Sequence, residues 1–200
     1  MLNFILPAAA YLIGSFSSAI IACRLMGLPD PRTIGSNNPG ATNVLRTGSK
    51  KAAAITLIGD CLKGLIPMCI ARWITDDSVI LASVGIAAFL GHLYPLYFGF
   101  KGGKGVATAL GVFLGTNGYF TLLILGVWLI TAIIFRYSSL AALTAAASAP
   151  FIIYWLSPDL PFTVLTIIIA AFLFCRHREN IHRLIKGTES KINLFKKKTT

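Results

Sequence analysis

The chain has 200 residues, of which 56% are hydrophobic and only 12% are charged, and it carries a formal net charge of +11. A soluble domain of this length would hold roughly 25% charged residues, so the composition excludes an ordinary soluble protein. The apolar runs approach 20 residues and do not alternate with polar residues, which predicts an all-α, polytopic membrane protein and excludes a β-barrel.

Seven membrane-spanning helices are predicted, and they leave room for a single integral-membrane domain over residues 1–200. The predicted spans cover about residues 4–26, 52–73, 79–97, 106–115, 119–135, 139–156 and 162–175. The fourth is short, and a re-entrant segment is the alternative there. That alternative would separate the basic tail from the basic first loop across the membrane, so we expect seven spans.

The charges in the loops predict the orientation of the chain. One set of alternate loops, together with the tail, holds most of the lysines and arginines, whereas the other set holds Asp76, Asp77 and Asp159. Positive loops stay in the cytoplasm, so we expect the amino terminus outside and the carboxyl terminus in the cytoplasm. The net charge then reflects orientation and contact with anionic lipid headgroups, including the terminal Lys196–Lys198 run, and not binding to nucleic acid.

The first loop contains a polar, glycine-punctuated stretch, GSNNPGATNVLR, at residues 35–46. Glycines let the backbone approach a ligand closely, short hydroxyl and amide side chains donate hydrogen bonds, and arginine offers a planar fork for phosphate. The stretch predicts an anion-binding loop; a turn-rich loop that only caps two helices is the alternative. The candidate binding side chains are Ser36, Thr42, Asn43 and Arg46.

Two charged residues fall inside the second predicted span. Asp60 and Lys63 are three residues apart and therefore share one helical face. Charges at membrane depth are costly and are usually paired or functional. We expect a structural ion pair, with the alternative that Lys63 contributes to a phosphate site.

A second glycine-rich turn leads into the fourth predicted span, with the sequence Lys101-Gly102-Gly103-Lys104-Gly105. Exposed backbone N–H groups at a helix N-terminus favour an anion, and two lysines add full positive charges. The spacing is not that of a Walker A motif, because a glycine follows Lys104. The turn predicts phosphate binding; a flexible turn whose lysines only set topology is the alternative.

The tail begins with a third polar group. His177 and Asn180 are three residues apart on one helical face, with Arg176 and Arg183 nearby. We expect this segment to leave the bilayer and lie along its surface. We expect His182 to be solvated. The sequence shows no metal-ligand cluster, its cysteines have no paired spacing, and no histidine is followed five residues later by aspartate, the pair used by common soluble-type glycerolipid acyltransferases.

These motifs, within residues 35–46, 91–108 and 176–189, carry a resemblance. Over nearly its whole length, the chain resembles the small integral-membrane acyl-phosphate:glycerol-3-phosphate acyltransferases of bacteria. The resemblance implies a multi-pass protein of the bacterial cytoplasmic (inner) membrane with its active site on the cytoplasmic face. It implies transfer of a fatty acyl group from acyl phosphate to the 1-hydroxyl of glycerol 3-phosphate, giving 1-acylglycerol 3-phosphate (lysophosphatidic acid) and inorganic phosphate without a cofactor.

The resemblance also implies roles for individual residues. Ser36 and Arg46 are implied to be essential, the glycines around Lys104 to serve the acyl phosphate, and His177 and Asn180 to act in catalysis. Glu189 is implied to support the structure.

The chemistry of an acyl phosphate fits these residue types. The donor is already an activated mixed anhydride, so the enzyme mainly needs to hold two phosphates and position a hydroxyl. Several cations are needed because two dianions repel, and hydrogen-bond donors must stabilise the developing oxyanion. His177 or a substrate phosphate oxygen is the candidate base. The acyl chain is expected to lie between spans, in contact with membrane lipid.

Two other functions are weighed against this one. A membrane carrier for a phosphorylated solute would also place cations at a membrane face, but it would usually show an internal repeat and polar groups in several spans. A phosphotransferase acting on lipid headgroups would need acidic residues to hold Mg²⁺, and few lie near these motifs. The acyltransferase is therefore the predicted function.

Overall fold

The computed structural model describes residues 1–192. The Lys196–Lys198 run, which was predicted to contact lipid headgroups, lies outside these residues. The described chain is entirely helical apart from turns and loops. Its helices are α1 (Leu2–Gly14), α2 (Ser18–Leu25), α3 (Ala41–Val44), η1 (Leu45–Thr47), α4 (Lys50–Ile74), α5 (Ser78–Leu93), η2 (Leu96–Phe98), α6 (Val106–Thr116), α7 (Gly118–Phe135), α8 (Ser138–Leu156), α9 (Leu160–Arg176) and α10 (Arg178–Ile185).

The helices have the length and apolarity of a multi-pass membrane protein. Five candidate spans are found in residues 1–192, or six if α9 and α10, which meet at 61°, form one broken span. Helix α6 is apolar but has only 11 residues, so it is about 16 Å long against a hydrocarbon core of roughly 30 Å. Large apolar side chains such as Leu122, Ile133 and Phe151 are exposed on the outside, as expected for a surface in contact with lipid.

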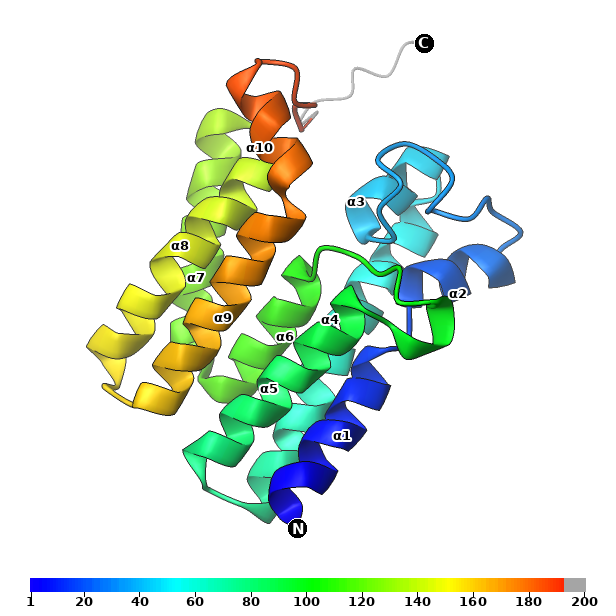
Figure 1. Ribbon diagram of the computed structural model, residues 1–200. Helices are drawn as coiled ribbons and strands as arrows, with labels where there is room; N and C mark the ends of the chain where they lie inside the picture. The colour runs from blue at the N-terminus through cyan, green and yellow to red at the C-terminus, as the bar shows by residue number, and fades with distance from the viewer. Residues whose placement is uncertain (193–200) are drawn as a thin grey trace.

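The first predicted span corresponds to a candidate span over Leu2–Leu25, but it is not one continuous helix, a break that the sequence analysis did not predict. Helix α1 ends at Gly14, and α2 starts at Ser18 and turns away from α1 (Figure 1). Helix α4 supplies a hydrogen-bond donor at the break: Lys63 Nζ donates to the Phe16 carbonyl oxygen at 2.7 Å. The backbone carbonyl freed at the break therefore finds its hydrogen bond in a residue 47 positions away, which hydropathy does not reveal.

Close helix packing in the bundle depends on glycine at several crossings. Helix α1 packs on α5, α4 on α6, and α8 on both α7 and α9. A Cβ on Gly14 would lie 2.1 Å from the Ala88 carbonyl oxygen, and one on Gly111 would lie 1.9 Å from the Cys61 carbonyl oxygen. Small residues let transmembrane helices approach closely, and this approach brings the polar ends of the helices together.

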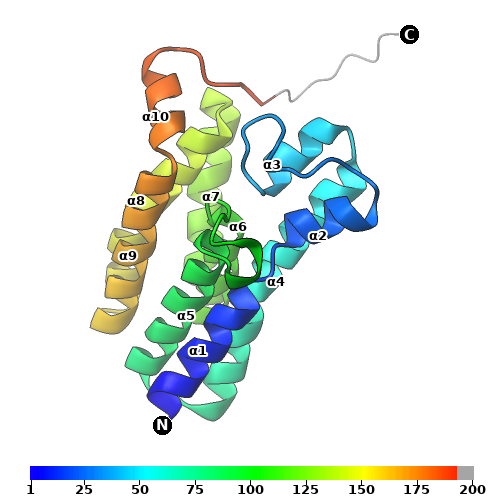
Figure 2. The same cartoon turned by 45° about the vertical axis from the view of Figure 1, so that its right-hand side comes forward.

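Helices α1, α4, α5, α6, α7, α8 and α9 run in alternating directions along the bundle (Figure 1). As a result, the loop that contains α3, the turn before α6 and the α9–α10 junction all face the end opposite the amino terminus (Figures 1 and 2). Segments that are far apart in the sequence therefore meet around one polar pocket.

Candidate active site

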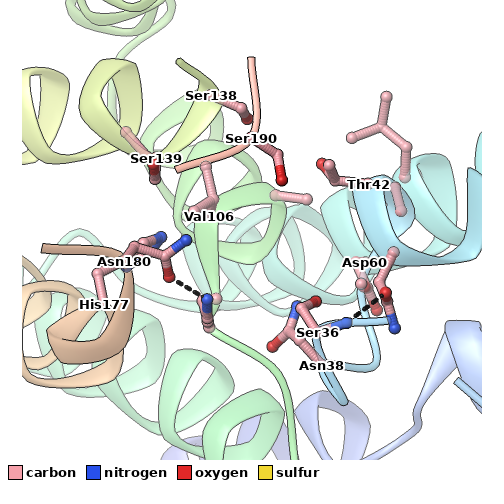
Figure 3. Close-up of a pocket in the computed structure, with 18 of the residues that line it drawn as sticks. Ser36, Asn38, Thr42, Asp60, Val106, Ser138, Ser139, His177, Asn180 and Ser190 are labelled. Carbon is pink, nitrogen blue, oxygen red and sulfur yellow. Dashed lines mark hydrogen bonds between the residues drawn. The ribbon is translucent and has the colours of Figure 1, made fainter. Parts of the chain in front are cut away.

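A polar cavity of about 210 Å³ opens at this end of the bundle. Its wall is built from the first loop, the beginnings of α6 and α8, and the α9–α10 junction. Figure 3 shows Ser36, Asn38 and Thr42 facing His177 and Asn180 across it. The sequence-predicted residues that line it are Ser36, Thr42, Asn43, Arg46, Asp60, Lys104, Gly105, His177, Asn180, Arg183 and Glu189.

Asn43 holds the first loop in shape. Its side-chain Nδ2 donates to the carbonyl oxygens of Pro31 at 2.7 Å and Ile34 at 3.0 Å, and its Oδ1 accepts from the Ser36 N–H at 3.0 Å. Both amide hydrogens are thus taken by the loop, although the sequence analysis placed Asn43 among the substrate-binding donors. The bonds fix the backbone of Ser36 at the cavity edge. The Ser36 hydroxyl and the side chains of Asn38, Thr42 and Arg46 are the other polar groups of this loop that line the cavity.

The sequence predicted that the turn before α6 exposes backbone N–H groups to an anion. In the structure, backbone groups of Gly102 and Gly103 are instead bonded to other parts of the protein. The Gly103 N–H donates to the His92 carbonyl oxygen at 3.3 Å, and the carbonyl oxygens of Gly102 and Gly103 accept from Arg176 at 2.9 and 3.2 Å. Gly102, Gly103 and the exposed Lys101 are absent from the cavity lining among the described residues. Their contact with substrate stays a prediction.

Lys104 is the residue that the turn delivers to the cavity. Its ammonium donates to the Asn180 side-chain oxygen on α10 (Figure 3). Burial lowers the pKa of Lys104, and the nearby positive charge of Arg183 lowers it further. A partly buried cation whose charged form is destabilised in this way gains from a bound anion.

His177 lies at the break between α9 and α10 and is only 4% exposed. Its Nδ1 lies 2.8 Å from the Leu173 carbonyl oxygen. A carbonyl oxygen only accepts, so we assign the hydrogen to Nδ1, which leaves Nε2 of the neutral ring as a proton acceptor.

Glu189 links three side chains at the wall of the cavity. Its Oε1 accepts from the Ser139 hydroxyl and the Asn180 Nδ2, each at 2.6 Å, and its Oε2 accepts from Arg183 Nε at 2.7 Å. Burial opposes ionisation of Glu189, but these hydrogen bonds outweigh it and lower the pKa of the carboxyl group. The carboxylate thereby ties the start of α8 to α10 and orients Asn180.

A buried ionic group forms the floor of the cavity. Lys63 Nζ lies 2.9 Å from Asp60 Oδ1, and His92 Nδ1 lies 3.7 Å from the same oxygen. Asp60 and His92 line the cavity, whereas Lys63 does not and points to the break between α1 and α2. The expected ion pair between Asp60 and Lys63 is present, and Lys63 also stabilises the break between α1 and α2.

Three lining residues were not singled out by sequence reasoning: Ser138, Ser139 and Ser190. Asn38 and His92 also line the cavity; they belong to the predicted motifs within residues 35–46 and 91–108 but were given no role of their own. In the sequence, Ser138 and Ser139 were expected only to lie at the start of a span, and His92 was expected only to lie near the end of another span. A signal for the α8 serines existed, since the charge pattern already put the loop at Arg136 on the same face as the other motifs.

An apolar cavity of about 220 Å³ adjoins the polar one. The two share Leu57, Val106, Trp128 and Ala142, and the apolar cavity continues between α6, α7 and α8. Residues 1–192 contain no group of three or more histidine, cysteine, aspartate or glutamate side chains arranged to hold a metal ion. The site thus combines cations and hydrogen-bond donors with a contiguous apolar space.

Comparison with known proteins agrees with this geometry. The family model described as "Glycerol-3-phosphate acyltransferase" matches residues 4–187. A glycerol-3-phosphate acyltransferase of Thioalkalivibrio sulfidiphilus is 56% identical over 94% of this chain and 92% of the relative. One of Halorhodospira halophila is 54% identical over 96% and 98% of the two chains.

Two similar solved structures are also of a glycerol 3-phosphate acyltransferase. The crystal structure of PlsY, an integral membrane glycerol 3-phosphate acyltransferase in its glycerol 3-phosphate form, superposes with a TM-score of 0.91 and 42% identity over 96% of each chain. Its lysophosphatidic acid form gives a TM-score of 0.89 and 41% identity over 96% of this chain and 95% of that one. The present chain therefore belongs to the glycerol-3-phosphate acyltransferase family.

Proposed function

We propose that the protein transfers a fatty acyl group from a long-chain acyl phosphate to the 1-hydroxyl of glycerol 3-phosphate. The products are 1-acylglycerol 3-phosphate and inorganic phosphate. One observation supports this most directly: the cationic polar cavity adjoins an apolar cavity, and the two share four lining residues. A donor with a phosphate head and a hydrocarbon tail fits such a pair of spaces, and the solved relatives carry glycerol 3-phosphate and lysophosphatidic acid in their names.

Three cations line the polar cavity and support the binding of two phosphates. Lys104 lies at the base of α6, Arg46 in the first loop and Arg183 on α10. Two phosphate dianions repel each other strongly in a partly dry site, and cations on different walls offset this repulsion. The arrangement brings the hydroxyl of one substrate to the activated carbonyl of the other.

The reaction then needs few groups from the protein. The glycerol oxygen attacks the acyl carbonyl, the bond from the carbonyl carbon to the phosphate oxygen breaks, and phosphate leaves with its electron pair. We expect the Ser36 hydroxyl and the Asn180 N–H that is not bound to Glu189 to donate to the developing oxyanion, because both residues line the cavity. Such a donor contributes roughly 3 kcal/mol in other enzymes.

The proton of the glycerol hydroxyl has two candidate acceptors, His177 Nε2 and a phosphate oxygen of a substrate. If His177 is the base, His177→Ala lowers kcat more than it raises KM, because the imidazole acts in the transition state. A change in KM alone would assign the proton to the phosphate. The reaction itself would be unchanged in either case.

We further propose a single domain with seven passes, in which α6 is a short fourth segment. The amino terminus lies outside, and the tail and active site face the cytoplasm of the bacterial inner membrane. The alternating directions of the helices and the basic loops at the pocket end support this orientation (Figure 1). A tag placed after Thr200 should be accessible only from the cytoplasmic side, and accessibility only from outside would overturn the orientation.

The function is tested by phosphate release from the purified protein in detergent. Long-chain acyl phosphate is supplied with and without glycerol 3-phosphate, and no metal, coenzyme A or carrier protein is added. Release that depends on glycerol 3-phosphate, together with formation of the acylated product, is expected. The absence of both from folded protein would overturn acyl transfer and make uptake of phosphorylated solutes into proteoliposomes the next measurement.

A further inference from the structure

We propose that Arg176 is a positioning residue for Lys104, and that it acts by holding the Gly102–Gly103 turn against His92. This inference rests on the proposed role of Lys104 in phosphate binding. It assigns a function to a cation that belongs to the third motif but does not line the polar cavity.

The guanidinium of Arg176 is committed to the turn. Its Nη2 donates to the Gly102 carbonyl oxygen at 2.9 Å and its Nε donates to the Gly103 carbonyl oxygen at 3.2 Å. The same group lies 5.9 Å from the ring centroid of Tyr94, which is a cation–π contact. Two hydrogen bonds from one planar group define both the position and the tilt of the turn.

His92 supplies the opposite side of the turn. Its carbonyl oxygen accepts from the Gly103 N–H, and its ring packs so closely on Gly103 that an added Cβ would lie 2.2 Å from Nε2. The His92 side chain is 5% exposed and lies beside Asp60 on the cavity floor. The turn is therefore held between two contacts. The buried pair of Asp60 on α4 and His92 on α5 lies on one side, and Arg176 lies on the other.

The contacts of Arg176 and His92 with the turn determine where Lys104 points. Lys104 follows Gly103 directly, and its ammonium reaches Asn180 on α10. Arg176 directly precedes His177, so the same helix end holds the turn and presents the side chains of the third motif. A lysine with several rotatable bonds reaches a fixed point only if its backbone is held, and Arg176 provides this restraint.

The first test compares Arg176→Gln and Arg176→Lys in the phosphate-release assay. We expect kcat/KM to fall ten- to a hundredfold in Arg176→Gln and three- to tenfold in Arg176→Lys, because one ammonium cannot reproduce both bonds and the contact with the ring. Arg72→Gln is the matched control. Arg72 also donates to a backbone carbonyl, that of Thr116, but at the other end of the bundle. A kcat/KM within twofold of the unaltered protein in Arg176→Gln would overturn the proposal.

The second test does not use the reaction. Acylation of lysines by an amine-reactive reagent is followed by mass spectrometry, with exposed Lys101 of the same turn as internal reference. Release of the turn should raise the labelling of Lys104 relative to Lys101 at least fivefold in Arg176→Lys and leave it unchanged in Arg72→Gln. An unchanged ratio in both Arg176 variants would overturn the proposal.

The two readouts separate the inference from the proposed function. Raised labelling with normal acyl transfer would overturn the link between the position of Lys104 and the reaction. If the unaltered protein transferred no acyl group, the proposed function would fail, and the labelling ratio would still decide whether Arg176 holds Lys104.

Discussion

Long-range side-chain hydrogen bonds are concentrated at one end of the bundle. Three local helix caps lie at the other end, where Arg72 also bonds to the Thr116 carbonyl oxygen. At the end with the polar cavity, side chains bond across long stretches of sequence: Lys104 reaches Asn180, Ser139 reaches Glu189, and Arg176 reaches two glycine carbonyls. These bonds join helices to turns and loops that are far away in the sequence. They also converge on one space that is large enough for small ligands.

At the opposite end, the helix starts are capped by their own neighbours. Asp77 accepts from the Val79 N–H at 2.8 Å, Asn117 from the Phe120 N–H at 2.9 Å, and Asp159 from the Phe162 N–H at 3.2 Å. Each cap satisfies an N–H group that the helix leaves free, and each is encoded within a few residues.

This contrast separates stability from activity. The local caps stabilise helices one at a time, so their loss should lower the free energy of unfolding and spare the reaction. The long-range bonds position groups around the cavity, so their loss should lower the rate more than the stability. The following variants test this division.

Lys104→Ala should have the largest effect. It removes a cation from the cavity wall, and we expect kcat/KM to fall roughly a hundred- to a thousandfold, as for other lost transition-state contacts of about 3–4 kcal/mol. The thermal midpoint in detergent should change by only a few degrees. Lys50→Ala, an exposed lysine at the same end, is the control. Normal turnover in Lys104→Ala would remove this residue from the mechanism.

Gly103→Ala should have the next largest effect. The added Cβ would lie 2.2 Å from His92 Nε2, so the turn must shift, and overpacking of this kind costs about 2 kcal/mol. We expect kcat/KM to fall about thirtyfold, which is the same energy expressed as a rate. Gly126→Ala is the matched control, because nothing lies within 4 Å of its added Cβ. Equal activities of the two variants would contradict the close contact between the turn and His92.

Glu189→Gln should lower kcat/KM roughly tenfold, since the charge-assisted bond to Arg183 is lost while an acceptor for Ser139 and Asn180 remains. Enzyme assays of the purified variant measure this effect. The orientation of Asn180 would not depend on the carboxylate if the rate stayed normal.

The same substitution has a pH signature. The folded-state pKa of Glu189 lies below the ordinary value of 4.5, so its contribution to stability is present above about pH 4.5 and is lost as the pH falls through the folded value. Thermal unfolding of the unaltered protein and of Glu189→Gln should therefore differ most near pH 6 and converge as the pH falls through the folded-state pKa. A difference that is independent of pH would exclude a stabilising carboxylate.

Asp77→Ala should have the smallest effect and should act on stability alone. Loss of an N-cap costs about 1 kcal/mol, and the residue is remote from the cavity. Thermal unfolding and kcat/KM are measured on the same preparation. A loss of activity without a loss of stability would break the division between the two ends.

Much of this molecule follows from local sequence. Runs of apolar residues specify an all-helical membrane protein because each span must satisfy its own backbone in lipid. The polar motifs within residues 35–46 and 176–189 were recognisable because such residues are costly in a greasy chain and lie where helices end. Loop charges also indicated which segments share a face.

Only the tertiary structure decided how these segments are used. Lys63 of α4 caps a break in the first predicted span, Asn43 shapes its own loop, and Glu189 gathers Ser139 with Asn180. Each of these roles depends on which groups helix packing brings within about 3 Å of one another, the range over which a hydrogen bond forms. Hydropathy and residue spacing describe a helix and its faces; the partner of a polar atom is set by the neighbouring helices.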